Sequence, residues 1–278
     1  MYKVMINCRN RLAITTKCIT ALTKHSVTKP EIYVYDNLTN YKVNEHFMYW
    51  NLLYQKGIIQ QVTFNTKVST FNAFSKAVAC NQFGFNHEQD PNKDKYDFLI
   101  FLDNDIIVTP QFDKILKDAW ADVKKNNMND IKVISQLPGG ITDKKEVPHK
   151  IAGFRAKSGL FGGSGLWCVQ NNFFKEIGYL NVSNFIGLHK KHDQQYWRKL
   201  GTVTKGKHYI LGLDIKLGIH CGKIAGSLCN TLTRATKIPQ KNVEELIKFE
   251  ESDKKIDSMG FDHFYKMIKN DKSLENDW

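Results

Sequence analysis

The 278-residue sequence contains no apolar run of about 20 residues, the length that a membrane-spanning helix needs. Its first residues, MYKVMINCRNR, have no apolar run behind their basic residues, so no secretion signal is visible. Cysteines are few and scattered: Cys8, Cys18, Cys80, Cys168, Cys221 and Cys229. They form no CxxC pair, which argues against a zinc site and a disulfide framework. We therefore expect a cytoplasmic protein with reduced, mostly buried thiols.

Acidic residues are also in deficit, with 28 Asp and Glu against 40 Lys and Arg and a formal net charge of +12. Such an excess indicates a polyanionic partner, for example nucleic acid or anionic lipid. However, the lysines form no single dense block, and a Lys- and Asn-rich chain also arises from AT-rich coding, so both explanations stay open. With 42% hydrophobic residues, the chain can bury a globular core.

The first half of the chain alternates strand and helix patterns. Short apolar runs predict strands at residues 2–6, 31–37, 60–64 and 96–102. Ile14, Cys18 and Leu22 recur every four residues and predict a helix after the first strand. This alternation predicts an α/β fold with a mostly parallel sheet covered on both faces, which binds ligands at the carboxyl ends of its strands.

Two more helices are predicted around the fourth strand. Ser69 can cap a helix that ends near Gly84, with Phe71, Phe74 and Val78 buried. Thr109 is a candidate N-cap with Pro110 at the first helical position. The apolar stripe of that helix would consist of Phe112, Ile115, Leu116, Ala119 and Val123.

The second half is less regular. We expect strands at residues 131–137 and 208–220, a polar loop at 137–150, and a glycine-rich turn leading into a strand at 159–169. Helices are expected near residues 172–177 and 189–200. A charged helix within residues 242–268 would cover the preceding part of the fold.

The stretch FLIFLDNDIIVTP, residues 98–110, places Asp103 and Asp105 at the tip of an apolar strand. Two such carboxylates repel each other near a core unless they face solvent or share a cation. Mg²⁺ and Mn²⁺ prefer oxygen ligands and also bind a diphosphate. The alternative is a solvated acidic turn that caps the next helix. Asp36-Asn37, at the end of another strand, is likewise compatible with ordinary turn chemistry.

Taken in order, these segments resemble the GT-A glycosyltransferases, particularly the family-2-like group that uses nucleotide sugars. VMINCRNR, residues 4–11, is similar to the first strand and loop of that group, with Asn10 and Arg11 matching and Cys8 and Arg9 departing. IYVYDN is similar to the strand whose last aspartate, here Asp36, binds uracil or ribose.

The resemblance continues through the chain to residue 222. NTKVSTFN keeps Asn65 and Asn72 of the family spacing, although Lys67 replaces the usual glycine. FLDND is the D-x-D motif, and FGGSGLWCVQNNFFKEIGYL resembles the acceptor-side segment that begins with a glycine pair. HDQQYWRKL has His192 in place of a glutamate and keeps Asp193 as the aspartate. IHCG resembles the late histidine-x-glycine.

The resemblance implies a role for each matched residue. Asp105 would bind Mn²⁺ or Mg²⁺ directly, Asp103 would contact ribose or metal-bound water, and His220 would complete the metal site. The nucleotide-sugar contacts would be Cys8, Arg9, Arg11, Asp36, Asn65, Asn72, Asp103 and Asn104. Asp193 would be the catalytic base, although an exposed aspartate of a polar helix is the alternative. The acceptor side would comprise Gly162, Gly163, His192 and Trp197, while Trp167 is assigned to the core.

The sequence therefore predicts a metal-dependent, inverting glycosyltransferase that uses a UDP-sugar. Residues 1–235 would form the catalytic domain, with a nucleotide-sugar half (1–108) and an acceptor half (109–235), and residues 236–278 a helical extension. The positive charge favours DNA with a hydroxymethylated base as acceptor, as for some viral relatives. A surface glycan, a lipid-linked sugar or a protein remains an alternative acceptor. A non-catalytic nucleotide or nucleic-acid binding module is the alternative of another class.

Overall fold

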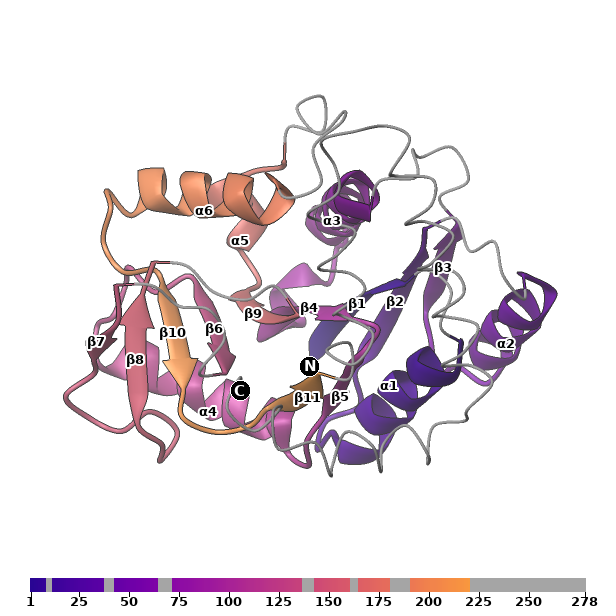
Figure 1. Ribbon diagram of the computed structural model, residues 1–278, viewed down its shortest axis with the longest axis horizontal. Helices are drawn as coiled ribbons and strands as arrows, with labels where there is room; N and C mark the ends of the chain where they lie inside the picture. The colour runs from indigo at the N-terminus through magenta and orange to yellow at the C-terminus, as the bar shows by residue number, and fades with distance from the viewer. Residues whose placement is uncertain are drawn as a thin grey trace, which may run out of the picture.

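The computed structural model describes residues 1–8, 12–37, 43–64, 72–136, 143–160, 165–180 and 191–220. Within this part, a nine-stranded mixed sheet forms the centre of the molecule (Figure 1), in the order β3-β2-β1-β4-β9-β6-β10-β8-β7. Its strands are β1 (Tyr2–Cys8), β2 (Glu31–Asp36), β3 (Gln61–Phe64), β4 (Phe98–Asp103), β6 (Val133–Gln136), β7 (Lys145–Glu146), β8 (Ala156–Gly159), β9 (Leu166–Gln170) and β10 (Ile210–Leu213). A separate two-stranded sheet pairs β5 (Ile106–Val108) with β11 (Gly218–His220).

The sheet is mostly parallel. Strands β9 and β8 run antiparallel to their neighbours, and the remaining seven share one direction. Every residue of β1 is buried, which explains its nearly continuous apolar sequence: a central parallel strand has both faces covered. The predicted α/β fold with a mostly parallel sheet is confirmed.

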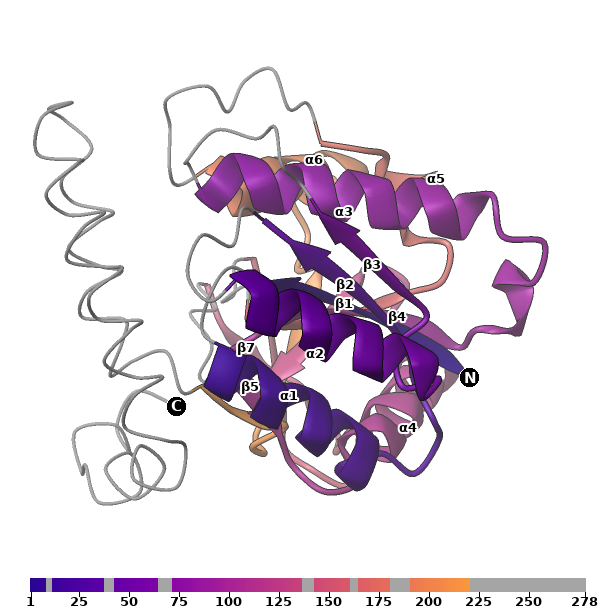
Figure 2. The same ribbon diagram turned by 90° about the vertical axis from the view of Figure 1, so that its right-hand side faces the viewer.

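Helices cover both faces of this sheet (Figure 2). On one face lie α1 (Leu12–His25), α2 (Val43–Gln55) and α4 (Phe112–Lys125). On the other lie α3 (Asn72–Glu88), α5 (Phe173–Ile177) and α6 (Lys191–Val203). The two layers of helices bury two separate apolar clusters against the sheet, so the fold has a core on each side.

Sequence reasoning missed α2 entirely. The helix buries His46, Trp50 and Leu53, which recur at helical spacing. Its outward face also carries large apolar side chains, including Phe47 at 60% and Met48 at 70% exposure. The two faces of α2 therefore differ little in hydrophobicity. A helix is recognised in a sequence by a large difference of this kind.

Two helix boundaries were also wrong. Helix α3 does not end near Gly84 but continues to Glu88. Gly84 lies against the ring of Phe174 of α5, where a Cβ atom would collide. The predicted N-cap Thr109 instead donates its hydroxyl hydrogen to the carbonyl oxygen of Lys216, at 2.8 Å, and α4 begins at Phe112. Gly84 and Thr109 thus contact distant segments of the chain and do not mark helix ends.

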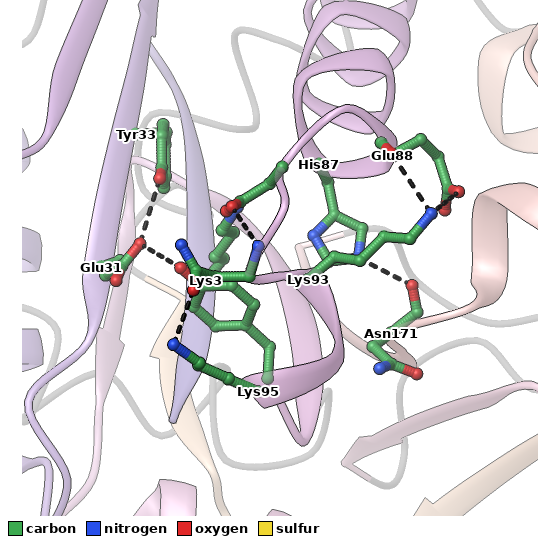
Figure 3. Close-up of polar contacts among 11 residues, drawn as sticks. Lys3, Glu31, Tyr33, His87, Glu88, Lys93, Lys95 and Asn171 are labelled. Carbon is green, nitrogen blue, oxygen red and sulfur yellow. Dashed lines mark hydrogen bonds and ion pairs between the residues drawn. The ribbon is translucent and has the colours of Figure 1, made fainter.

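A polar cluster fixes the amino ends of the strands, at the opposite end of β1 from Cys8 (Figure 3). Lys3 is only 3% exposed, and its Nζ lies 2.5 Å from Asp90 Oδ2 and 4.4 Å from the ring centroid of Tyr96. Tyr33 and Tyr96 both donate to Glu31 Oε2. Burial acts to raise the pKa of Asp90, but the hydrogen bond from Lys3 contributes to a net lowering. This cluster ties the loop before β4 to the sheet.

Three further expectations concern the cysteines, membrane-spanning helices and the C-terminal extension. Cys8, Cys18, Cys80 and Cys168 are buried thiols that form no disulfide, as predicted. No helix of the described residues is long and apolar enough to cross a bilayer. The helical extension expected at residues 236–278 lies outside the described residues.

Candidate functional site

The carboxyl ends of β1, β2 and β4 gather the first group of candidate residues. Cys8 pairs in register with Asp36, and Asn7, one residue earlier on β1, pairs with Asp103. Three segments that are far apart in the sequence thus end side by side at one edge of the sheet. This is the edge at which parallel α/β sheets bind ligands.

Asp36 is held by the helix that follows it. Its carboxylate is 1% exposed, and Oδ2 accepts a hydrogen bond from Trp50 Nε1 at 3.0 Å. His46 Nδ1, one helical turn before Trp50, lies 3.7 Å from the same oxygen. Beside it, burial and then the charge of Asp36 raise the pKa of the Cys8 thiol, which therefore stays neutral. Helix α2 thus fixes the orientation of one carboxylate at the sheet edge.

The D-x-D segment forms a tight connection between β4 and β5. Asp105 is 7% exposed, as is Asn104, whose Nδ2 donates to Thr15 Oγ1 at 2.7 Å. The carboxylate of Asp103 remains 26% exposed. The segment is therefore not a fully solvated acidic turn, because its second and third residues are buried.

Lys76 is a candidate site residue that the sequence interpretation overlooked. It lies on α3, one helical turn after Asn72, and its Nζ is 2.5 Å from Asp103 Oδ1. Lys76 is 9% exposed, so this ammonium is largely removed from water. The spacing of four residues from Asn72 was the available signal, since residues i and i+4 share one helix face.

Strand β11 brings the end of the described chain to the D-x-D segment. His220 lies opposite Ile106 in the antiparallel pair with β5, next in sequence to Asp105. Two backbone amides, those of Leu217 and Gly218, donate to Gln136 Oε1 at 2.9 Å and anchor the start of β11. The predicted neighbourhood of His220 and Asp105 is thus present in the backbone; the side chain of His220 lies outside the described part.

The glycine-rich segment also reaches Asp103. The amide of Asp103 donates to the carbonyl oxygen of Gly165 at 2.9 Å, immediately before β9. A Cβ atom on Gly165 would lie 3.0 Å from Ile106 Cδ1 and 4.0 Å from Asp103 Oδ2. A side chain at this position would therefore crowd Ile106, and glycine permits the close approach of the two segments.

Helix α6 carries three further candidates, of which the structure gives the backbone only. Asp193 and His192 lie in the first turn of α6, and Trp197 lies one turn later. The helix is held to the body by Tyr196, which is fully buried 5.9 Å from the ring centroid of Trp167. Trp167 is 4% exposed, so its assignment to the core is confirmed. The remaining candidates fall outside the described residues: Arg9, Arg11, Asn65, Gly162 and Gly163.

A divalent metal fits the donor atoms at this edge. Asp103 and Asp105 offer carboxylate oxygens, the ligand type that Mn²⁺ and Mg²⁺ prefer. Within the described ranges, no group of three or more His, Cys, Asp and Glu side chains comes together.

Solved structures with a similar fold are glycosyltransferases. A mannosyltransferase from Pyrobaculum calidifontis, PcManGT, in complex with GDP-Man and Mn²⁺, superposes with a TM-score of 0.54 at 10% identity, over 89% of this chain and 63% of that one. GalNAc-T7 with UDP, GalNAc and Mn²⁺ gives 0.51 at 14% identity, over 97% and 57%. The fold is that of the GT-A glycosyltransferases.

At these low sequence identities the comparisons show the fold and not the activity or the substrate. Residues 1–349 of Staphylococcus aureus TarS give a TM-score of 0.49 at 15% identity, over 88% of this chain and 68% of that one. The chain spans less than two thirds of the length of PcManGT and of GalNAc-T7. No family model matches the sequence, and no curated protein matches it. The GT-A fold predicted from the sequence is confirmed.

Proposed function

We propose that the protein is a metal-dependent glycosyltransferase that moves a sugar from a nucleotide sugar to an acceptor hydroxyl. The observation that carries this proposal is the meeting of Asp103, Asp105 and the backbone of His220 at the ligand-binding edge of a GT-A fold. PcManGT and GalNAc-T7, which share the fold, were solved with GDP-Man or UDP and with Mn²⁺.

The donor in this proposal is a UDP-sugar. Asp36, held by Trp50 and paired in register with Cys8, would accept hydrogen bonds from uracil or ribose. Cys8 and Asn104 would contribute further nucleotide contacts. Arg9 and Arg11 would bind phosphate oxygens, because a guanidinium fork matches their geometry. Asn65 and Asn72 would contribute further donor contacts.

Asp105 and His220 would hold Mn²⁺ or Mg²⁺, while Asp103 would contact ribose or metal-bound water. A bound divalent metal offsets the negative charge on the departing diphosphate. Asp105 directly precedes Ile106, which pairs with His220, and this proximity supports the assignment.

Asp193 is the proposed catalytic base. Its carboxylate would take the proton of the acceptor hydroxyl while that oxygen bonds to the anomeric carbon and the bond to the diphosphate breaks. A single base acting on the face opposite the leaving group gives inversion. Gly162 and Gly163 would allow close approach of the acceptor, and His192 and Trp197 would contact it.

The proposed acceptor is DNA that carries a hydroxymethylated base. The net charge of +12 supports a polyanionic acceptor, and such an enzyme would flip the base out of the duplex. Phosphate contacts would dominate affinity, so binding should weaken steeply between dilute and physiological salt. Duplex affinity that ignores salt would contradict a DNA acceptor, and surface glycans, lipid-linked sugars and proteins would then be the candidates.

A second candidate is a non-catalytic nucleotide or nucleic-acid binding module, which Lys67 and His192 favour because they break the family pattern. In either case we propose that residues 1–235 act as one unit, with residues 236–278 as an extension.

Incubation of UDP-sugars and Mn²⁺ with unmodified, hydroxymethylcytosine and hydroxymethyluracil DNA tests the acceptor. A sugar mass increment on one modified nucleoside is expected; UDP binding with neither release nor transfer would favour the module.

A further inference from the structure

The side chain of Lys76 reaches the D-x-D segment from α3, on a different element from the two aspartates. Lys76 is 9% exposed, and its Nζ lies 2.5 Å from Oδ1 of Asp103. The side chain of Asp103 is 26% exposed and belongs to the carboxylates at the ligand-binding edge. An ammonium thus already neutralises one of the two carboxylates of the motif.

The backbone of Asp103 is fixed independently of Lys76. Its amide donates to Gly165, and its carbonyl oxygen accepts from the thiol of Cys18, with Sγ at 3.9 Å. Oδ1 of Asp103 faces Lys76 of α3, whereas Oδ2 lies on the side of Gly165, 4.0 Å from its Cβ position. The Lys76 ammonium therefore holds Oδ1 of this carboxylate on the side of α3.

A second lysine–aspartate pair shows what a purely structural contact looks like in this fold. Lys3 and Asp90 lie at the amino ends of the strands, and the Lys3 ammonium packs over the rings of Tyr96 and Tyr33. That cluster contains none of the candidate site residues. The pair of Lys76 and Asp103 lies instead beside Asp105, where a cation is expected to bind.

We propose that Lys76 is a positioning residue that holds Asp103 in the absence of metal and opposes the binding of metal alone. This inference rests on the proposed function. A divalent cation that approaches the carboxylates meets the positive charge of Lys76, and like charges a few ångströms apart repel strongly in a partly buried site. A diphosphate offsets this repulsion and can accept hydrogen bonds from the same ammonium. Metal and nucleotide therefore bind cooperatively, each strengthening the other.

The test measures Mn²⁺ affinity by electron paramagnetic resonance of free Mn²⁺, first without nucleotide and then with saturating UDP. Lys76→Met should bind Mn²⁺ alone about tenfold more tightly than the unmodified protein, because the repulsion is removed. The factor by which UDP increases Mn²⁺ affinity should fall by a similar amount. Lys76→Arg, which retains the charge, should keep the weak affinity for Mn²⁺ alone.

Two further variants make the result interpretable. Lys76→Gln removes the charge but keeps a hydrogen-bond donor, and it replaces Lys76→Met if that variant does not fold. Lys114→Met removes an exposed lysine of α4 that pairs with Asp118 and should leave both affinities unchanged. A purely structural role for Lys76 predicts weaker Mn²⁺ binding on substitution, the opposite sign.

The outcomes separate this inference from the proposed function. If the unmodified protein binds Mn²⁺ together with UDP but the charge-removing variants bind Mn²⁺ alone no more tightly, Lys76 is structural and the inference is overturned. If the unmodified protein binds Mn²⁺ neither alone nor with UDP, the proposed function fails and the inference fails with it.

Discussion

Ile106 and His220 lie directly opposite each other in the antiparallel pair of β5 and β11. Ile106 follows the D-x-D segment, whereas His220 is the last described residue. The pairing brings the end of the described chain back to the edge of the sheet where β1, β2 and β4 terminate. Both halves of the chain therefore contribute backbone to the candidate site.

The close approach of β11 to β5 depends on Gly218. A Cβ atom there would lie 2.7 Å from Ile106 Cγ2, closer than side-chain atoms tolerate. Gly218→Ala should lower the free energy of unfolding by about 1–3 kcal/mol, as overpacking typically does. It should also weaken Mn²⁺-dependent UDP binding, because β5 adjoins Asp105. Chemical denaturation and calorimetric titration measure the two effects.

Gly201 supplies the matched control for that substitution. It lies inside α6, and a Cβ atom there would have no neighbour within 4 Å. Gly201→Ala should leave UDP binding unchanged and raise the free energy of unfolding by up to about 1 kcal/mol, since alanine favours a helix interior. Equal effects of the two substitutions would remove the special role of Gly218.

The position of Asp36 depends on Trp50. Trp50→Phe keeps an aromatic ring in α2 but removes the N–H that donates to the buried Asp36 carboxylate. The free energy of unfolding should fall by about 1.5–3 kcal/mol, the usual range for a lost hydrogen bond to a charged group. UDP affinity should fall as well, while Mn²⁺ affinity without nucleotide stays the same. Unchanged UDP affinity in a folded variant would argue against Asp36 as a nucleotide ligand.

Substitution of Asp193 separates binding from transfer. Asp193→Asn should leave UDP binding intact and lower the transfer rate by at least about 100-fold, within the range that a general base contributes. Calorimetric titration with UDP and a transfer assay on the same preparation make the comparison. Normal transfer by this variant would exclude Asp193 as the base.

His87 should make stability depend on pH. Burial lowers its pKa from the ordinary 6.5, and Nε2 lies 2.8 Å from the carbonyl oxygen of Asn171. In the unfolded chain the imidazole binds a proton more readily, so below about pH 6.5 protonation favours unfolding. The melting temperature should therefore fall between pH 7.5 and pH 5.5, and His87→Gln should reduce that slope. An unchanged slope in this variant would show that other groups cause the pH dependence.

Most of the fold was predictable because its strands are buried on both faces and read as uninterrupted apolar runs, as in β1 and β4. Other features depend on tertiary contacts that local sequence does not encode. Helix α2 was missed because apolar side chains also cover its outer face. The position of Gly84 against Phe174 and the antiparallel direction of β9 likewise follow from packing between distant segments.

The candidate site also combines residues that local sequence indicates with residues that only tertiary contacts reveal. Asp36 and Asp103 could be found because each ends a recognisable strand, and the structure aligns those strands side by side. Lys76 was harder to find among 40 Lys and Arg residues, because its spacing from Asn72 was the only signal and its contact with Asp103 depends on the fold. The pairing of β11 with β5 could not be predicted from the sequence either, since strand register depends on the three-dimensional structure.

The most direct test of the central claim is UDP release from a panel of UDP-sugars, with and without Mn²⁺. It compares the unmodified protein with Asp105→Ala and with the control Asp118→Ala, which changes an exposed carboxylate of α4. We expect slow, Mn²⁺-dependent release of UDP from one sugar, with at least about a 100-fold loss in Asp105→Ala and none in the control. Absence of UDP binding and release for every sugar, or full activity of Asp105→Ala, would contradict a metal-dependent glycosyltransferase.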